Sequence, residues 1–109
     1  MTINTNLTAN ELKAAIILVT SCLDGMGGKR PADLAHDEYT WVEAGDLMKA
    51  GFSRHEANGT FGALMEKGFV SSYGKRRNGE NKMIEEWVLA TAAWQFLDTV
   101  WDAQTAAAE

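Results

Sequence analysis

The chain has 109 residues, 46% of them hydrophobic, which is enough for one domain with its own core and too few for two. We therefore expect a single domain over 1–109, with its core between about 8 and 103 and a frayed tail at 104–109. Its single cysteine, Cys22, excludes an internal disulfide, and its place in an apolar run favours a buried thiol. The N-terminus lacks the pattern of a signal peptide and no segment has membrane-spanning length, so we expect a cytoplasmic protein without a membrane partner.

The net charge of −5 is unevenly distributed along the chain. Between Lys49 and Lys82 there are seven basic and three acidic residues, for a local charge of +4. The remaining residues include three basic and twelve acidic ones, for a charge of −9. This asymmetry is typical of an acidic protein with one anion-binding face, although a chance cluster of solvated charges is the alternative interpretation.

Three segments begin with the capping-box pattern, in which a hydroxyl residue is followed three positions later by glutamate. The patterns are Thr8-x-x-Glu11, Thr40-x-x-Glu43 and Ser53-x-x-Glu56. Apolar residues at helical spacing follow each of them. We therefore predict three helices: from about Ala9 to a stop at Gly25, from Trp41 to Ala50, and from Arg54 to Lys67.

The loop from Gly25 to Glu38 contains the only proline, and it predicts a short helical turn at Ala32–Ala35. His36 and the carboxylates beside it lack the ligand spacing of a recognised metal site. Paired groups for acid–base or nucleophilic catalysis are not legible anywhere in the chain. We therefore expect no metal, no cofactor and no enzymatic activity.

After Gly68 the pattern changes to β-structure. Phe69–Tyr73 and Met83–Leu89 are rich in aromatic and branched residues, and Asn78-Gly79 between them is the strongest two-residue hairpin signal. A last helix, capped by Thr91, is expected from Ala92 to about Ala103. It carries several apolar residues at helical spacing, which favours a place in the core: Trp94, Leu97, Val100 and Trp101.

Two helices joined by Gly51-Phe52-Ser53 have the connection length of a helix-turn-helix. With the following hairpin, this order resembles the winged helix superfamily, and the flanking first and last helices are most similar to MarR-type regulators. The stretch Phe52–Val70, which ends in Glu-Lys-Gly-Phe-Val, is similar to the family's capped recognition helix, and the resemblance covers about half the chain. The expected fold class is α+β, mostly helical: a winged helix-turn-helix with N- and C-terminal flanking helices and a two-stranded β-hairpin wing.

The resemblance implies that Ala57, Phe61 and Leu64 pack inward. Another set of residues would then face a DNA groove: Arg54, His55, Asn58, Gly59 and Gly62. The two glycines supply no hydrogen-bonding side chain for base readout, and each costs about 1 kcal/mol relative to alanine in a helix. Either a close approach of the backbone to a ligand or packing against a neighbour would account for them. Leu47 and Ala50, in the preceding helix, reverse the sizes that many helix-turn-helix sequences have there.

The hairpin tip is the best candidate for phosphate contact, because its basic residues flank the Asn78-Gly79 turn. A merely solubilising turn is the alternative. The full expected nucleic-acid-binding set comprises Arg54, His55, Asn58, Lys75, Arg76, Arg77 and Lys82.

These observations favour a DNA-binding protein similar to transcriptional regulators, which contacts double-stranded DNA through helix 54–67 and the basic wing 74–82. The MarR-type resemblance also implies a homodimer, for which the interface candidates are Ile17, Trp94, Leu97 and Trp101. The alternative is a winged-helix adaptor, or a small inhibitor, that binds a protein partner and no DNA. A ligand-sensing regulator with a pocket between the tryptophan-rich helices is a third hypothesis.

Overall fold

A computed structural model describes residues 3–36, 40–77 and 79–106 of the chain. The helices are α1 (Ala9–Met26), the 3-10 helix η1 (Pro31–His36), α2 (Ala44–Lys49), α3 (Arg54–Glu66) and α4 (Thr91–Ala106). The strands β1 (Trp41–Val42), β2 (Val70–Arg77) and β3 (Met83–Leu89) form one antiparallel sheet in the order β1-β3-β2. The expected α+β class is therefore confirmed.

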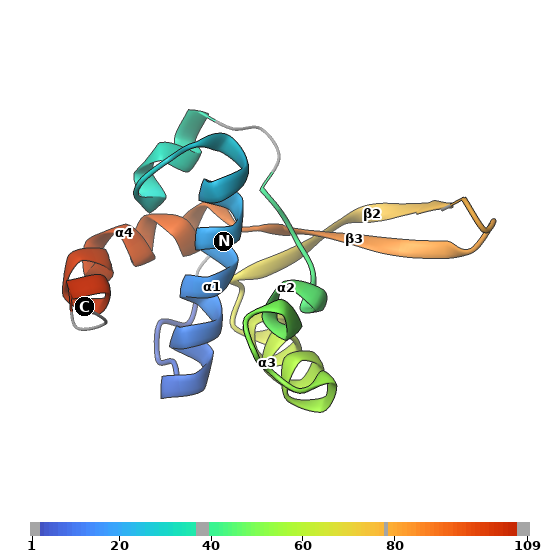
Figure 1. Ribbon diagram of the computed structural model, residues 1–109, viewed down its shortest axis with the longest axis horizontal. Helices are drawn as coiled ribbons and strands as arrows, with labels where there is room; N and C mark the ends of the chain where they lie inside the picture. The colour runs from blue at the N-terminus through green and yellow to red at the C-terminus, as the bar shows by residue number, and fades with distance from the viewer. Residues whose placement is uncertain (1–2, 37–39, 78, 107–109) are drawn as a thin grey trace.

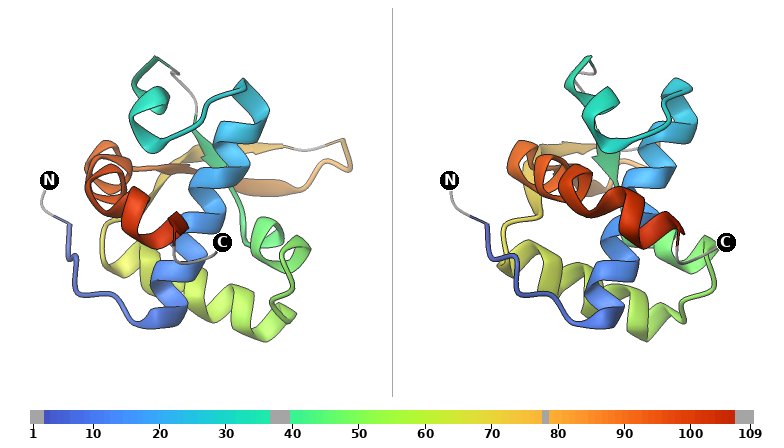
Figure 2. Two further views of the ribbon diagram at one scale, coloured as in Figure 1. Left: turned by 60° about the vertical axis from the view of Figure 1, so that its left-hand side comes forward. Right: turned by 90° about the vertical axis from the view of Figure 1, so that its left-hand side faces the viewer.

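Helix α1 runs through the middle of the molecule, with α4 on one side and α2 and α3 on the other (Figures 1 and 2). Its buried residues recur at three- and four-residue spacing, which places them on one helical stripe. They pack with buried residues of α3 and with Ala93 and Leu97 of α4 in one core. The buried residues of α1 are Ala14, Ala15, Leu18, Val19 and Leu23. Cys22 is half-buried, and its Sγ lies 3.6 Å from the carbonyl oxygen of Trp41, so the thiol is less enclosed than expected.

Two of the three predicted capping boxes are present. At α1 the Thr8 N–H donates to Glu11 Oε1 at 2.9 Å, and the Glu11 N–H donates back to Thr8 Oγ1 at 3.2 Å. At α3 the N–H groups of Ser53 and Glu56 donate to each other's side chains, both at 3.1 Å. These contacts satisfy amides that have no partner within the helix.

The third predicted box is wrong, because Thr40 caps no helix. Thr40 is buried, its Oγ1 donates to the Leu89 carbonyl at 3.2 Å, and its own carbonyl accepts from the Leu89 N–H at 3.0 Å. The next two residues form β1 against β3, so α2 begins only at Ala44. There the Asp46 carboxylate accepts from the Glu43 N–H at 3.0 Å. The pairing of β1 with β3 therefore outweighs the helix-start pattern at Thr40, although that pattern matches the capping box as well as the other two do.

Several helix ends also differ from expectation. Helix α1 passes Gly25 and ends at Met26, because Gly27 adopts the left-handed conformation (φ 75°) that closes the helix. Thr91 is the first residue of α4 and not its cap, and α4 continues to Ala106, so the expected frayed tail is helical as far as it is described. The helical turn predicted near Ala32–Ala35 is confirmed by η1.

The hairpin closes through a longer loop than predicted. A two-residue Asn78-Gly79 turn would pair Arg77 with Glu80, whereas the structure pairs Arg77 with Met83 and leaves five residues, 78–82, in the loop. Asn78 itself lies outside the described residues. At the other end of the ladder this register sets Val70 opposite Leu89, and both are buried, so the core selects the register. Irregular pairing between Ser72 and Gly74 accommodates the difference.

Beyond its base, the hairpin extends away from the helices as a two-stranded ribbon (Figure 1). Two edge-on aromatic contacts hold the base. The ring of Phe61 in α3 lies 6.0 Å from that of Trp87 in β3, and Phe69 lies 6.0 Å from Phe96 in α4. These contacts fix the direction of the ribbon relative to α3 and α4.

A candidate nucleic-acid interface

The outer face of α3 is open to solvent. Ala57, Phe61 and Leu64 are buried, as the family resemblance implies, so the side of α3 that carries them faces the core. Arg54, His55 and Asn58 are exposed. The predicted α3 site residues are therefore together on one accessible surface.

No close contact among the described residues requires a glycine at position 59 or 62 of α3. A Cβ atom built at Gly59 or at Gly62 meets nothing within 4 Å outside the helix's own nearby backbone. Of the two explanations for these glycines, packing against a neighbour within the described chain is therefore excluded. What remains is a smooth surface at which an external partner can approach the backbone closely.

Two further lysines, which sequence reasoning did not assign to the site, flank the beginning of α3. Lys49 is exposed at the end of α2, and the Lys13 Nζ on α1 lies 5.7 Å from the centre of the Phe52 ring. Lys13 is 39 positions before Phe52, so no local sequence pattern could have predicted that it lies near the start of α3. Lys13 adds positive charge near the start of α3, where it lowers the pKa of Glu56.

The one carboxylate in the first turn of α3 is held as part of the cap. The pKa of Glu56 is lowered, first by hydrogen bonds from the side chain and backbone of Ser53 and then by the positive charges of His55 and Lys13. Glu56 therefore favours its ionised form and accepts the hydrogen bond of the Ser53 N–H.

The ribbon presents a mixed surface. Lys75 and Arg77 are two residues apart on β2 and so share one face, and Met83 lies opposite Arg77 on β3. Arg77 Nη1 donates to the Asn81 carbonyl at 3.2 Å and contacts Asn81 Oδ1 at 3.4 Å, where Asn81 has a positive φ of 64°. Arg77 is exposed and also holds the loop in shape. For Arg76 only the backbone is described, and it pairs with Ile84.

The ribbon is less basic than the sequence window 49–82 indicates. Strand β3 brings Glu85 and Glu86 opposite Lys75 and Gly74, and Lys82 Nζ lies 3.8 Å from Glu80 Oε2. Residues 75–86 include four basic and three acidic residues, so their net charge is +1. The expected wing 74–82 itself has four basic residues and one acidic one, and the paired residues of β3 add two acidic ones, Glu85 and Glu86, to the ribbon.

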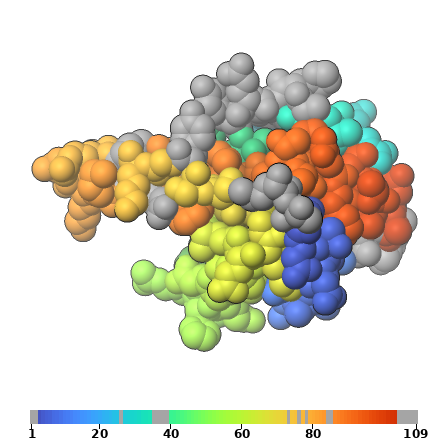
Figure 3. Space-filling model, turned by 180° about the vertical axis from the view of Figure 1, so that it is seen from behind, coloured from blue at the N-terminus to red at the C-terminus, as the bar shows by residue number. Residues whose placement is uncertain are grey.

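The α3 residues and the ribbon project from the same side of the molecule. In Figure 3 the hairpin extends to the left, and the segment around residues 50–57 projects in the same direction below it, with open space between them. Their common base is the contact between Phe61 and Trp87. The structure thus brings the two predicted groups to one side without merging them into one patch.

The four predicted dimer residues do not form one accessible surface. Leu97 is fully buried and Trp101 is 8% exposed, so both belong to the core of the protomer. Trp94 is half-buried on α4. Ile17 lies on the opposite side of α1, in a groove of about 360 Å³ that α2 also lines with Asp46, Lys49 and Ala50.

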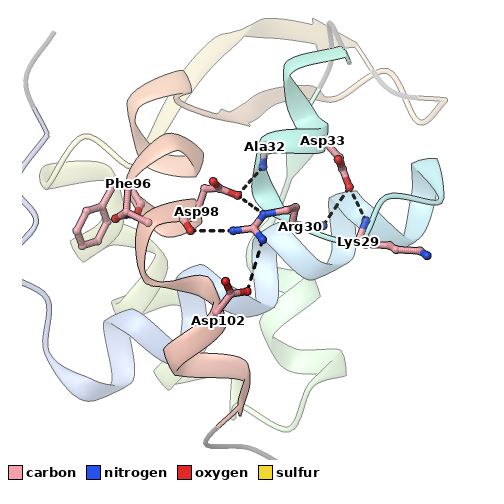
Figure 4. Close-up of polar contacts among 8 residues, drawn as sticks. Lys29, Arg30, Ala32, Asp33, Phe96, Asp98 and Asp102 are labelled. Carbon is pink, nitrogen blue, oxygen red and sulfur yellow. Dashed lines mark hydrogen bonds and ion pairs between the residues drawn. The ribbon is translucent and has the colours of Figure 1, made fainter.

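A separate polar cluster joins η1 to α4 (Figure 4). Arg30 Nε donates to Asp98 Oδ1 at 2.9 Å, Ala32 N–H donates to the same oxygen at 3.1 Å, and Arg30 Nη1 lies 3.5 Å from Asp102 Oδ1. The hydrogen bond from Arg30 is the main reason that the pKa of Asp98 is lowered. Because Arg30 and Asp98 are satisfied by each other, this cluster has a structural role. Its members are 68 positions apart, beyond the reach of sequence patterns.

Comparisons of this chain with protein-family models, with curated proteins and with solved structures give no match. Among the described residues, no group of three histidine, cysteine or carboxylate side chains is placed to hold a metal ion. Within the same residues, no helix is both long and apolar enough to cross a membrane. A functional assignment therefore depends on the geometry and charge of the chain itself.

Proposed function

We propose that this chain is a winged-helix protein of the MarR-like type that binds double-stranded DNA in a regulatory role. In this proposal α3 enters the major groove and the ribbon of β2 and β3 is the wing. The observation that carries it is the open face of α3, where Arg54, His55 and Asn58 are exposed beside two glycines with free space around them. Such a face serves no packing purpose within the chain.

The chemistry of this face favours phosphate contact over base reading. Arg54 and His55 lie in the first turn of α3, where free amides and the helix dipole attract an anion. Asn58 has the amide that can pair with the edge of an adenine, whereas Gly59 and Gly62 can read no base. Lys75 and Arg77 on the ribbon add cations for the DNA backbone. We therefore expect modest sequence preference and strong dependence on salt.

A homodimer is part of this proposal, because paired half-sites would compensate for weak reading by each protomer. Leu97 and Trp101 cannot contribute to its interface in this conformation, since both are buried. The dimer contact would have to involve other surfaces, such as the half-buried Trp94.

Fluorescence anisotropy of a labelled DNA duplex, titrated at several salt concentrations, tests the proposal. Arg54→Ala and Lys75→Ala should each weaken binding and reduce the slope of log K against log salt by about 0.9. Lys29→Ala is the matched control, because it removes one exposed cation from the loop between α1 and η1. An absence of salt-dependent binding, or equal binding by all four proteins, would contradict the proposal.

A protein-binding adaptor is the second candidate, and two observations favour it. The net charge is −5 and the ribbon is nearly neutral, and Trp41 and Met48 are large apolar side chains with exposed fractions of 40% and 43%. Affinity purification from the native cell after nuclease treatment separates the two candidates. A stable partner that is lost on Trp41→Ala, together with no DNA binding in the titration, would favour the adaptor.

A further inference from the structure

We infer that Met83 is an apolar wedge that enters the minor groove of the bound duplex and bends it. This inference rests on the proposed function and specifies how the wing engages DNA. Met83 has an exposed fraction of 55%, the largest among the exposed large hydrophobic side chains of the described residues. Met83 is at the opposite end of the β2–β3 ladder from the buried pair of Val70 and Leu89, so the core gives no reason for an apolar group there.

The neighbours of Met83 select DNA as its partner. Arg77 is directly opposite on the paired strand, and Lys75 and Glu85, which pair with each other, are the next residues on the same face, so the face carries a net charge of +1. Exposed cations beside an exposed apolar side chain match the two requirements of a minor-groove wedge, which must attract phosphates and then insert between base pairs. A protein pocket for Met83 would instead need to neutralise those cations.

The ribbon also holds Met83 in a defined position. The hydrogen bonds from Arg77 to Asn81 shape the loop that precedes Met83, and the contact of Phe61 with Trp87 fixes the ribbon to α3. An insertion at the wing therefore occurs at a set distance from the α3 contact. A wedge inserted from the minor groove kinks the duplex toward its major groove, and the contacts at α3 help to offset the cost of unstacking.

Fluorescence resonance energy transfer between dyes at the two ends of a duplex of about 25 base pairs measures the bend, and anisotropy on the same duplex measures affinity. The wild-type protein should raise the transfer efficiency. Met83→Ala should abolish most of that rise and weaken binding by about tenfold, whereas Met83→Leu should retain both. Met83→Lys should keep salt-dependent binding and lose the bend. Met48→Ala, which removes a similarly exposed methionine from α2, is the control and should behave as the wild type.

The outcomes distinguish this inference from the proposed function. Salt-dependent binding by the wild type without a bend, or an equal bend with Met83→Ala, would overturn the wedge and leave the DNA-binding proposal intact. A wild-type protein that binds no duplex would overturn both. Thermal unfolding of each variant verifies that its fold is intact, which the exposure of Met83 leads us to expect.

Discussion

At the scale of single residues, glycine at positions 59 and 62 lowers the stability of α3. Glycine in a helix interior costs about 1 kcal/mol relative to alanine, because the unfolded chain has more freedom to lose. A methyl group at either position would meet nothing within 4 Å, so the fold gains no compensating contact. Under the proposed function, these glycines let the bound duplex approach the backbone of α3 closely.

Replacing Gly59 with alanine should therefore separate stability from binding. We expect Gly59→Ala to raise the free energy of unfolding by about 0.5–1 kcal/mol, measured by urea denaturation. The same variant should weaken DNA binding in the anisotropy titration, because the methyl group lies on the proposed contact face. Gly51→Ala is the contrasting variant and should be destabilising, since Gly51 has a φ of +111° that alanine adopts only with strain. A loss of stability with Gly59→Ala would refute this interpretation of α3.

Asp98 should make stability depend on pH. Because Arg30 lowers its pKa in the folded state, Asp98 contributes stability above its ordinary pKa, and this contribution is lost as pH falls through the lowered value. Asp98→Asn keeps the shape and removes the charge. We expect it to lower the free energy of unfolding by about 1 kcal/mol near neutral pH, a modest effect because the pair is partly exposed.

Urea denaturation of both proteins across a range of pH checks this. The difference between wild type and Asp98→Asn should vanish at acid pH, where the wild-type carboxylate is protonated as well. Asp102→Asn is the control and should have a smaller effect, since Asp102 is 82% exposed and 3.5 Å from Arg30. A difference that persisted unchanged into strong acid would show that charge is not the cause.

At the scale of elements, a strand and a helix compete for the segment after Thr40. Locally, Thr40-x-x-Glu43 satisfies the helix-start pattern as well as Ser53-x-x-Glu56 does. In the folded chain the Thr40 hydroxyl donates to the Leu89 carbonyl and the Leu89 N–H donates to the Thr40 carbonyl, and the segment that follows becomes β1. The two hydroxyl residues therefore have opposite environments, one buried in the sheet and one exposed at a helix start.

An aspartate at each position distinguishes these environments. Ser53→Asp should leave the free energy of unfolding within about 0.5 kcal/mol of the wild type, because aspartate caps a helix as well as serine. Thr40→Asp should lower it by about 2 kcal/mol or more, because a carboxylate would be buried where the threonine side chain now donates a hydrogen bond. Chemical denaturation of both variants is the measurement. Equal tolerance at the two positions would indicate that Thr40 caps a helix after all.

At the scale of the whole molecule, the last helix closes the core of the protomer. Leu97 is fully buried and packs in the same cluster as residues of α1, α3 and η1. The predicted use of Leu97 and Trp101 at a dimer interface is therefore replaced by a role in folding each protomer. A dimer formed through another surface would leave this role unchanged.

Leu97→Ala should consequently destabilise the protomer itself. We expect a loss of about 2–5 kcal/mol in the free energy of unfolding, the usual cost of a cavity at a buried leucine. The loss should be the same at low and high protein concentration, because it arises within one chain. Thermal unfolding over a hundredfold range of concentration measures this. A loss that grew on dilution would place Leu97 at an interface between chains.

Features that depend on neighbours along the chain could be predicted from the sequence. Two capping boxes, the inward stripe of Ala57, Phe61 and Leu64, and the two long strands all follow from local spacing, because a helix or strand repeats its contacts every few residues. The exposure of His55 was foreseeable for the same reason, since His55 lies opposite that stripe, whereas Arg54 and Asn58 border the stripe and are exposed near the start of the helix.

Features that depend on distant residues required the folded structure. Hydrogen bonds with Leu89 hold Thr40 beside the sheet and not at a helix start, the buried pair of Val70 and Leu89 sets the register of the hairpin, and that register places Glu85 opposite Lys75. The physical reason is that these choices are worth about a kcal/mol or less locally, whereas burying large apolar side chains contributes more. The core therefore determined which local signals became structure, and through the register it determined which charged residues face each other on the ribbon.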